Sequence, residues 1–488
     1  MQKSLKKNFV LSVFRTLVMM VVPLVIFPYA SRILGKEGVG RVQYIQSIAT
    51  YFQLFATSGI TYYGIREGVK FREDREKMGQ FVSEMLLINF LTTAVAMLAY
   101  TILFFVPSLS GYHTLIAMFG IYVISNGINL DWFFNVREDY LYITVKTFFL
   151  YLLAVILMFV LLHDAQDFLI YALVIILPYA GTLLTNLRQI RKTVPLTFKK
   201  KYHLKKHICP IMMVFSITVS SSIYLLLDST MLGAMCGDGE VGLYTSASKL
   251  SRLVVQVITA VCAVFLPRLS YYVGRSESEK FKQLAERCAK LIIILTIPCA
   301  IGIFSLAPEA ILIFSGEEFL AAVPALRILA WNLFFSAADS FIGWQILVPN
   351  NKERFLLLAT VLGAGMDFGL NFLLIPHLGV EGAALATLFA ECTVFIVCVV
   401  ASRHLLLIRN LMVQILKCIV ASLPILVVAL TVGLFFHSVV LKSTVTVLVA
   451  GIIYFILLLI MNDEIVCYGR DWIVRTFSVH KKNLERGK

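Results

Sequence analysis

Charge is scarce in this sequence. Of its 488 residues, 15% are charged and 59% are hydrophobic, whereas soluble globular domains carry about 25% charged residues. This composition excludes a soluble globular fold, and we expect the chain to insert into a membrane. A single span needs about 20 apolar residues in a helix, because the bilayer core offers no water to unpaired backbone groups.

The usual signatures of metal, redox and nucleotide chemistry are also missing. The nine cysteines are scattered without a CxxC pair, so neither a disulfide framework nor a zinc site is expected. The sequence has no HExxH and no GxxxxGK[ST]. We therefore predict no cofactor, no metal and no enzyme activity. A transporter of this kind must use a proton or sodium gradient, the gradient of its substrate, or a separate ATPase.

Long apolar runs, in contrast, recur along the whole chain. They predict an all-α, polytopic membrane protein with about fourteen transmembrane helices. The predicted spans lie near residues 9–34, 42–65, 81–106, 112–135, 145–163, 168–190, 208–235, 244–267, 288–307, 324–348, 355–376, 380–402, 411–436 and 443–461.

The basic residues predict the orientation. Of the 43 Lys and Arg residues, 35 fall in segments expected on the cytoplasmic side and four in outside loops, which is the asymmetry that short loops show in membrane proteins. Both termini are therefore predicted to be cytoplasmic. Because the basic residues are dispersed over many loops, the net charge of +14 indicates contact with anionic membrane lipids rather than with nucleic acid.

A repeat divides the chain. The segment LGKEGVG at 34–40 returns as LGAMCGDGEVG at 232–242, shifted by 202 residues. Six predicted spans separate the copies, which indicates a parallel repeat of two six-helix lobes. We place the lobes at 1–200 and 201–406 and an extra helix pair with a basic tail at 407–488. The basic loop at 191–207 joins the lobes, and its His203 and His207 are expected to be solvated.

A polar stripe follows each repeated loop at helical spacing. The first stripe consists of Gln43, Gln46, Thr50, Gln53 and Thr57, and the second of Thr245, Ser248, Arg252, Gln256 and Thr259. Such a face either lines a water-filled cavity or bridges packed helices. The charge of Arg252 favours the cavity. Asn126 and Asn129 extend this polar path, and for the adjacent Asp131 a capping or loop role is expected.

Several motifs resemble those of a known family. They are SRILGKEGVG at 31–40, DWFFNVRED at 131–139, LGAMCGDGEVGLYTSASKL at 232–250, VFLPRLS at 264–270, GWQILVPNNKERF at 343–355 and NFLLIPHLGVEGAALAT at 371–387. Together they resemble the Wzx-type oligosaccharide-lipid flippases of the multidrug, oligosaccharidyl-lipid and polysaccharide exporter superfamily. The resemblance implies two lobes that open alternately and a bacterial plasma-membrane location. It also implies export of an undecaprenyl-diphosphate-linked repeat unit for capsule, O-antigen or a related polymer.

A diphosphate cargo requires cations inside the membrane. Arg15, Lys249 and Arg252 are the candidate phosphate ligands, and Gln46, Thr50, Gln53, Asn126 and Asn129 are further candidate substrate contacts. The alternatives are snorkelling of the cations to the interface or pairing of Lys249 with Asp228. Arg327, at a helix start, is expected to be an interfacial anchor. Four acidic residues in predicted spans are candidates for proton or sodium coupling: Asp228, Asp339, Asp367 and Glu391.

Three function classes compete at this point. They are a lipid-oligosaccharide flippase, a cation-coupled exporter of drugs or metabolites, and a membrane-embedded polysaccharide synthase. The loops are too short for the nucleotide-sugar domain of a synthase, and intramembrane arginine suits an anionic cargo better than a cationic drug. A lipid II flippase of the same superfamily is the nearest rival. The leading hypothesis allows a polymerase and glycosyltransferases as partners.

Overall fold

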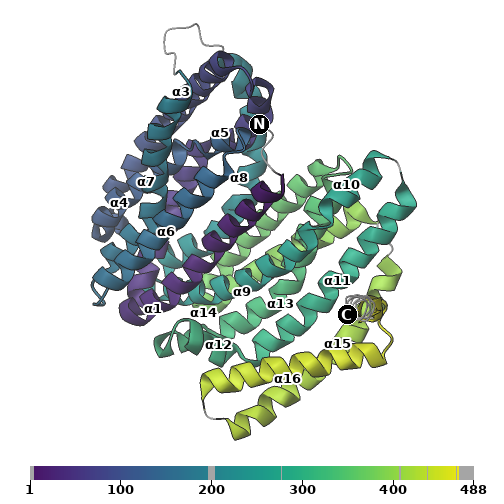
Figure 1. Cartoon of the computed structure of the whole chain (residues 1–488). Coiled ribbons are helices and arrows are strands. Elements are labelled where there is room, and N and C mark those ends of the chain that lie inside the picture. Colours follow the sequence, from purple (N-terminus) through teal and green to yellow (C-terminus); the bar gives the residue numbers. More distant parts are fainter. Residues whose placement is uncertain are drawn as a thin grey trace, which may run out of the picture. The chain divides into compact units, whose positions relative to one another are not determined.

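The computed structural model describes residues 5–195, 204–275, 277–405, 408–436, 438–468 and 470–471. Within these ranges the chain is helical and forms no strand (Figure 1). Ten helical stretches in these ranges are long and apolar enough to cross a membrane, or eleven if one bent pair counts as a span. The predicted all-α, multi-pass architecture is confirmed. The count of fourteen spans stays a prediction.

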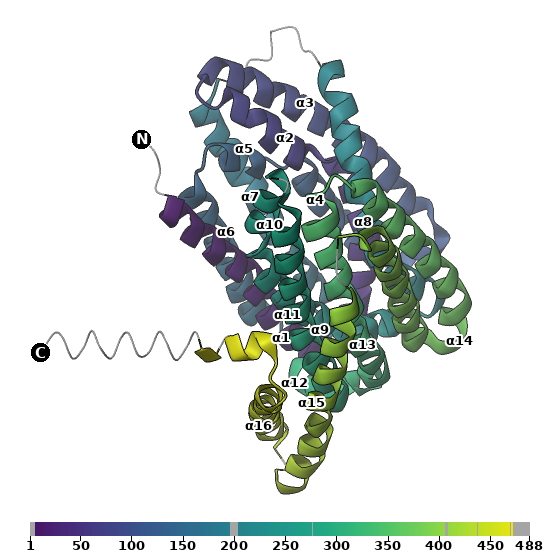
Figure 2. The same cartoon turned by 90° about the vertical axis from the view of Figure 1, so that its right-hand side faces the viewer.

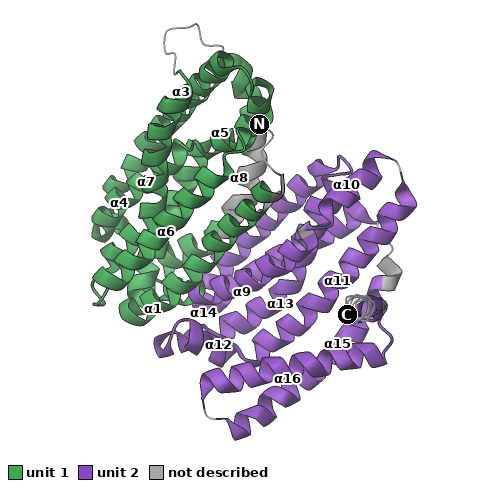
Figure 3. Cartoon of the chain, viewed as in Figure 1, with its two compact units in different colours: residues 1–245 green, residues 246–488 purple. Residues whose placement is uncertain are grey.

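The chain divides into two compact units, residues 1–245 and 246–488 (Figure 3). The helices of unit 1 are α1 Leu5–Thr57, α2 Ile60–Gly68, α3 Arg75–Tyr100, α4 His113–Gly127, α5 Asp131–Val136, α6 Tyr140–Leu161, α7 Phe168–Thr193 and α8 Leu204–Met235. In this division α8, which packs against α1 and α2, belongs to unit 1. The lobe boundaries predicted at 200 and 406 stay predictions.

Helix α9, Asp238–Ala263, begins in unit 1 and continues into unit 2. The remaining helices of unit 2 are α10 Leu266–Gly274, α11 Ser278–Ser305, α12 Ala307–Phe314, α13 Val323–Ser340, α14 Glu353–Ser402, α15 Ile408–Phe435 and α16 Val439–Ile460. The predicted C-terminal pair, α15 and α16, lies side by side in both views, and α15 also packs on α11 (Figures 1 and 2).

Two of the helices are each broken by one glycine. Gly35 in α1 and Gly379 in α14 have φ of 66° and 52°, in the left-handed region that favours glycine. The 53 residues of α1 would extend about 80 Å if straight, far more than a bilayer core of about 30 Å. The break at Gly35 therefore divides α1 into two membrane-length segments, at the first copy of the repeated loop.

The two copies of the repeated loop pack against each other. A Cβ added at Gly40 would lie 1.8 Å from the carbonyl oxygen of Asp238, and one added at Gly242 would lie 2.0 Å from that of Lys36. The shift of 202 residues relates Gly40 to Gly242 and also Lys36 to Asp238. The contact is therefore reciprocal, as at a two-fold axis. We call this contact, formed by residues 36–40 and 238–242, the glycine crossing.

The segment DWFFNV forms α5 and is anchored by its aromatic residues. Trp132 and Phe133 are fully buried. Trp132 stacks edge-on against Phe81 of α3, with ring centroids 5.6 Å apart. The absence of a side chain at Gly64 leaves room for this indole, since a Cβ there would lie 2.6 Å from it. This packing fixes the start of α5, where Asp131 is located.

Candidate functional site

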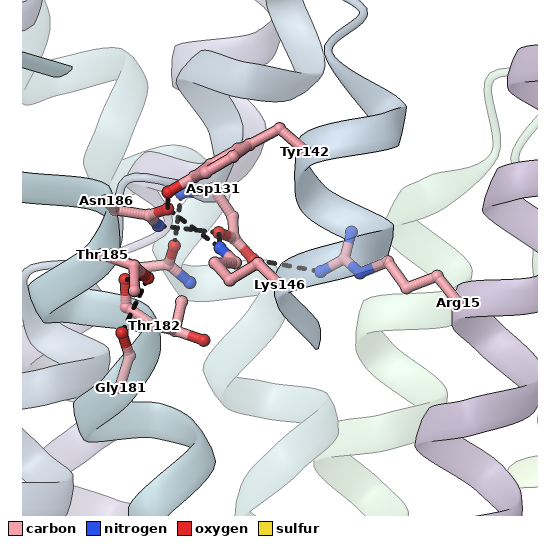
Figure 4. A network of polar contacts seen from close by, with 9 residues as sticks. Arg15, Asp131, Tyr142, Lys146, Gly181, Thr182, Thr185 and Asn186 are labelled. Atoms are coloured by element: carbon pink, nitrogen blue, oxygen red, sulfur yellow. Dashed lines mark hydrogen bonds and ion pairs between the residues drawn. The ribbon is translucent and has the colours of Figure 1, made fainter. Parts of the chain in front are cut away.

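An ion cluster lies among the membrane helices of unit 1 (Figure 4). Asp131 accepts from Arg15 of α1 through Oδ2 at 3.0 Å and from Lys146 of α6 through Oδ1 at 2.6 Å. The Lys146 side chain is 4% exposed, whereas that of Arg15 is 24% exposed. One carboxylate thus faces two cations, and the cluster carries one surplus positive charge. We call these three residues together with Asn186 the unit 1 ion cluster.

Neutral polar groups hold Asp131 and Lys146 in place. Asn186 of α7 donates to Asp131 Oδ1 at 2.8 Å and accepts from Lys146 at 2.9 Å. Tyr142 donates to the same Asn186 oxygen at 3.2 Å. The Asn129 side chain accepts from the backbone N–H of Asp131 at 2.8 Å. Side chains of three helices, α1, α6 and α7, therefore converge on one carboxylate.

Two expectations about this region need correction. Asp131 was expected in a capping or loop role, but its side chain is the centre of the ion cluster, because two cations and an amide reach it. The predicted fifth span at 145–163 placed Lys146 at its cytoplasmic edge, but the residue is 7% exposed about two turns inside α6, which begins at Tyr140. Arg15 and Asn129, both predicted substrate contacts, do lie beside this carboxylate.

The first polar stripe lies half-buried along the second half of α1. Thr50 donates to the backbone of Gln46 at 2.7 Å, and Gln53 donates to Thr57 at 2.8 Å, so these bonds stay within the helix. The side chain of Asn126, also half-buried, bonds the backbone oxygen of Tyr122. Substrate contact by Gln46, Thr50, Gln53 and Asn126 stays a prediction.

The second stripe lies on α9 and becomes more exposed along the helix. Ser248 is buried, Lys249 is half-buried and Arg252 is exposed. The two cations are electrostatic neighbours. Arg327, the expected anchor, is exposed and holds its guanidinium 5.5 Å from the ring of Phe304. The phosphate-ligand role of Lys249 and Arg252 stays a prediction.

All four acidic candidates for ion coupling are buried. Asp228 accepts a hydrogen bond from the Tyr244 hydroxyl. Glu391 of α14 accepts a hydrogen bond from the Ser336 hydroxyl of α13 at 3.4 Å, and Asp339 lies one turn further along α13. Asp367 is 1% exposed. Across the described ranges, no group of three or more His, Cys, Asp or Glu side chains could hold a metal ion.

A second polar group in unit 1 was missed from the sequence. His207 of α8 contacts the Tyr63 hydroxyl through Nδ1 at 2.6 Å and Glu84 of α3 through Nε2 at 3.0 Å. All three side chains are buried. The expectation of a solvated His207 is therefore wrong, while His203 lies outside the described residues. The burial of His207 could not be predicted from the sequence, because the lysines at 205 and 206 give this segment the composition of a loop.

We expect His207→Ala to destabilise the protein. The substitution removes one hydrogen-bond partner from the buried Glu84 carboxylate and one from the buried Tyr63 hydroxyl, and losing a buried partner costs about 1–3 kcal/mol. Thermal unfolding of the purified protein in detergent should show a midpoint several degrees below the unsubstituted protein. His404→Ala is the matched control, because His404 is exposed. Equal midpoints for both variants would contradict a structural role of His207.

The fold and its polar groups define a multi-pass helical membrane transporter. A family model described as polysaccharide biosynthesis protein matches residues 4–273. That is more than half of the chain, so the protein belongs to this family. It is 24% identical over 379 residues to a putative O-antigen transporter of Shigella dysenteriae, covering 76% of this chain and 92% of the relative. It is also 21% identical over 414 residues to one of Escherichia coli (strain K12), covering 80% and 92%.

A solved structure extends the likeness to the fold of nearly the whole chain. The lipid II flippase MurJ in its inward closed conformation matches with a TM-score of 0.71 at 17% identity, covering 95% of this chain and 100% of that structure. These findings confirm the resemblance to Wzx-type flippases of the exporter superfamily. The relatives are transporters, so the expected class, a flippase and not an enzyme, is confirmed as well.

Proposed function

We propose that this flippase moves an undecaprenyl-diphosphate-linked oligosaccharide across a bacterial plasma membrane for capsule, O-antigen or related polysaccharide synthesis. The observation that carries the proposal is the surplus cation of the unit 1 ion cluster. A positive charge among membrane helices costs free energy, so its presence there indicates a functional role. Arg15 can present a planar fork of N–H donors to phosphate oxygens. Lys249 and Arg252 supply further positive charge on α9.

The protein also has surfaces that suit the sugar chain and the polyprenyl tail of such a cargo. Sugar hydroxyls suit the half-buried amides and hydroxyls of the first polar stripe, which can both donate and accept hydrogen bonds. A cavity of about 380 Å³ in unit 2 is lined only by apolar and aromatic side chains from α11, α13 and α15, among them Ile297, Phe335 and Leu423. Such a lining suits a polyprenyl tail. The similarity to putative O-antigen transporters also supports this cargo.

Deletion of the gene tests the cargo. We expect synthesis of the lipid-linked repeat unit to continue and its transfer to stop, so that the unit accumulates on the cytoplasmic leaflet and surface polymer disappears. Lipid extraction with leaflet-specific labelling measures this. A plasmid copy of the gene should restore the polymer. Unchanged polymer in a strain without a redundant transporter would contradict the proposal.

A lipid II flippase is the second candidate, because the MurJ structure shares the fold. It predicts accumulation of lipid II, loss of wall synthesis and lysis in the same deletion strain. A drug exporter instead predicts greater sensitivity to cationic drugs with normal polymer. Coupling to protons or sodium through Asp228, Asp339, Asp367 or Glu391, and association with a polymerase or glycosyltransferases, belong to the proposal as well.

The proposed orientation places both termini in the cytoplasm. Cys236, in the second repeated loop, should then face outward, while Cys209 and Cys467 should face inward. In intact cells that express single-cysteine variants of the protein, a membrane-impermeant thiol reagent should label Cys236. It should label Cys209 and Cys467 only after the cells are permeabilised. Cys209 is a suitable control because it is exposed, as Cys236 is. The reverse labelling pattern would overturn the orientation.

A further inference from the structure

The two oxygens of Asp131 are used unequally. Oδ1 accepts from both Lys146 and Asn186, at 2.6 and 2.8 Å. Oδ2 accepts one hydrogen bond, from Arg15 Nη2 at 3.0 Å. The ammonium of Lys146 is therefore sufficient to neutralise the carboxylate, and the pairing of Arg15 adds a second cation to a charge that is already balanced.

The two cations also differ in how firmly they are held. Lys146 is buried, bonds Asp131 and Asn186, and lies 5.4 Å from the ring of Tyr142. Arg15 is the most exposed member of the unit 1 ion cluster and makes one side-chain hydrogen bond. Its buried Nε has no hydrogen-bond partner within the described part of the chain. The three other N–H groups of its two terminal nitrogens thus remain available for another ligand.

We propose that Lys146 is a positioning residue, which neutralises Asp131 so that Arg15 stays available for the diphosphate group of the substrate. This inference rests on the proposed function, since it assigns the diphosphate to Arg15. Without the ammonium at position 146, Asp131 would have Arg15 as its one cation in the cluster. The guanidinium would then pair with the carboxylate, and a diphosphate would have to compete with a buried negative charge.

A charge-balanced pair of variants distinguishes this role from a structural one. Lys146→Met should weaken binding of purified protein to undecaprenyl diphosphate by about tenfold or more. Lys146→Met combined with Asp131→Asn removes both charges, keeps the surplus cation and should restore binding to within about threefold of the unsubstituted protein. Unfolding midpoints are measured for both. A double variant that binds as weakly as the single one, or more weakly, would overturn the inference.

A second readout does not depend on the substrate. Phenylglyoxal modifies accessible guanidinium groups, and peptide mass spectrometry can follow Arg15 alone. The modification of Arg15 should slow in Lys146→Met and recover in the double variant, whereas equal rates in all three proteins would overturn the inference. If the unsubstituted protein fails to bind undecaprenyl diphosphate, the proposed function is wrong, and the modification rates still decide whether Lys146 keeps Arg15 available.

Discussion

Arg252→Ala is expected to abolish export of the lipid-linked oligosaccharide. Arg252 is an exposed cation on the polar stripe of α9, and Lys249 lies one turn earlier. If the diphosphate also contacts α9, removing the guanidinium takes one counter-charge away from a doubly charged group in a medium of low dielectric. Surface polymer in the deletion strain, complemented with each variant, measures the effect.

The conservative variant and a second arginine provide the controls. Arg252→Lys should keep part of the export, because a point charge replaces a planar fork imperfectly. Arg327→Ala should export normally, since Arg327 is an exposed cation that lies outside the polar stripe and contacts Phe304. Immunoblots must show equal amounts of all variants. A normal amount of surface polymer with Arg252→Ala would indicate that the second polar stripe packs helices together and does not bind substrate.

Gly40→Ala is expected to destabilise the protein and, like Arg252→Ala, to abolish export. A Cβ at this position would lie 1.8 Å from the carbonyl oxygen of Asp238, a backbone atom that cannot rotate away. The two loops of the glycine crossing would have to separate, and overpacking of this kind costs about 1–3 kcal/mol or more. We expect lower protein yield, a lower unfolding midpoint and loss of surface polymer.

Another glycine serves as the matched control for the crossing. Gly369 lies in α14, and a Cβ added there would meet no atom within 4 Å. Gly369→Ala should therefore be neutral or slightly stabilising, because alanine favours the helix by about 0.5–1 kcal/mol. If Gly40→Ala behaves like Gly369→Ala, the loops tolerate separation and the close approach has no importance for stability.

The sequence was sufficient to predict the helical membrane architecture, because hydropathy depends on averages over long stretches of the chain. The break at the first repeated loop was also predictable, since Gly35 lies inside a motif that recurs 202 residues later. The neighbourhood of Asn129 and Asp131 followed from their closeness in the chain. These predictions succeeded because each depends on local or periodic information.

The pairing partners of the site could not be predicted in the same way. Arg15 and Asp131 are 116 residues apart, and Lys146 and Asn186 are 40 apart. Hydropathy cannot distinguish a lysine in a cytoplasmic loop from one buried a few turns into a helix, and the predicted start of the fifth span at 145 placed Lys146 at its edge. The burial of His207 could not be predicted for the same reason, because the lysines beside it give the segment the composition of a loop.

The glycine crossing bears on the ancestry of the chain. Reciprocal contact between equivalent positions is the pattern of an isologous interface between two identical subunits, here formed within one chain. An ancestor with half the length would have met a second copy of itself at this loop, with residue 40 of each copy against residue 36 of the other. Today the equivalent positions are Lys36 and Asp238. Gene fusion thus allowed opposite charges at positions where a homodimer could place only like ones.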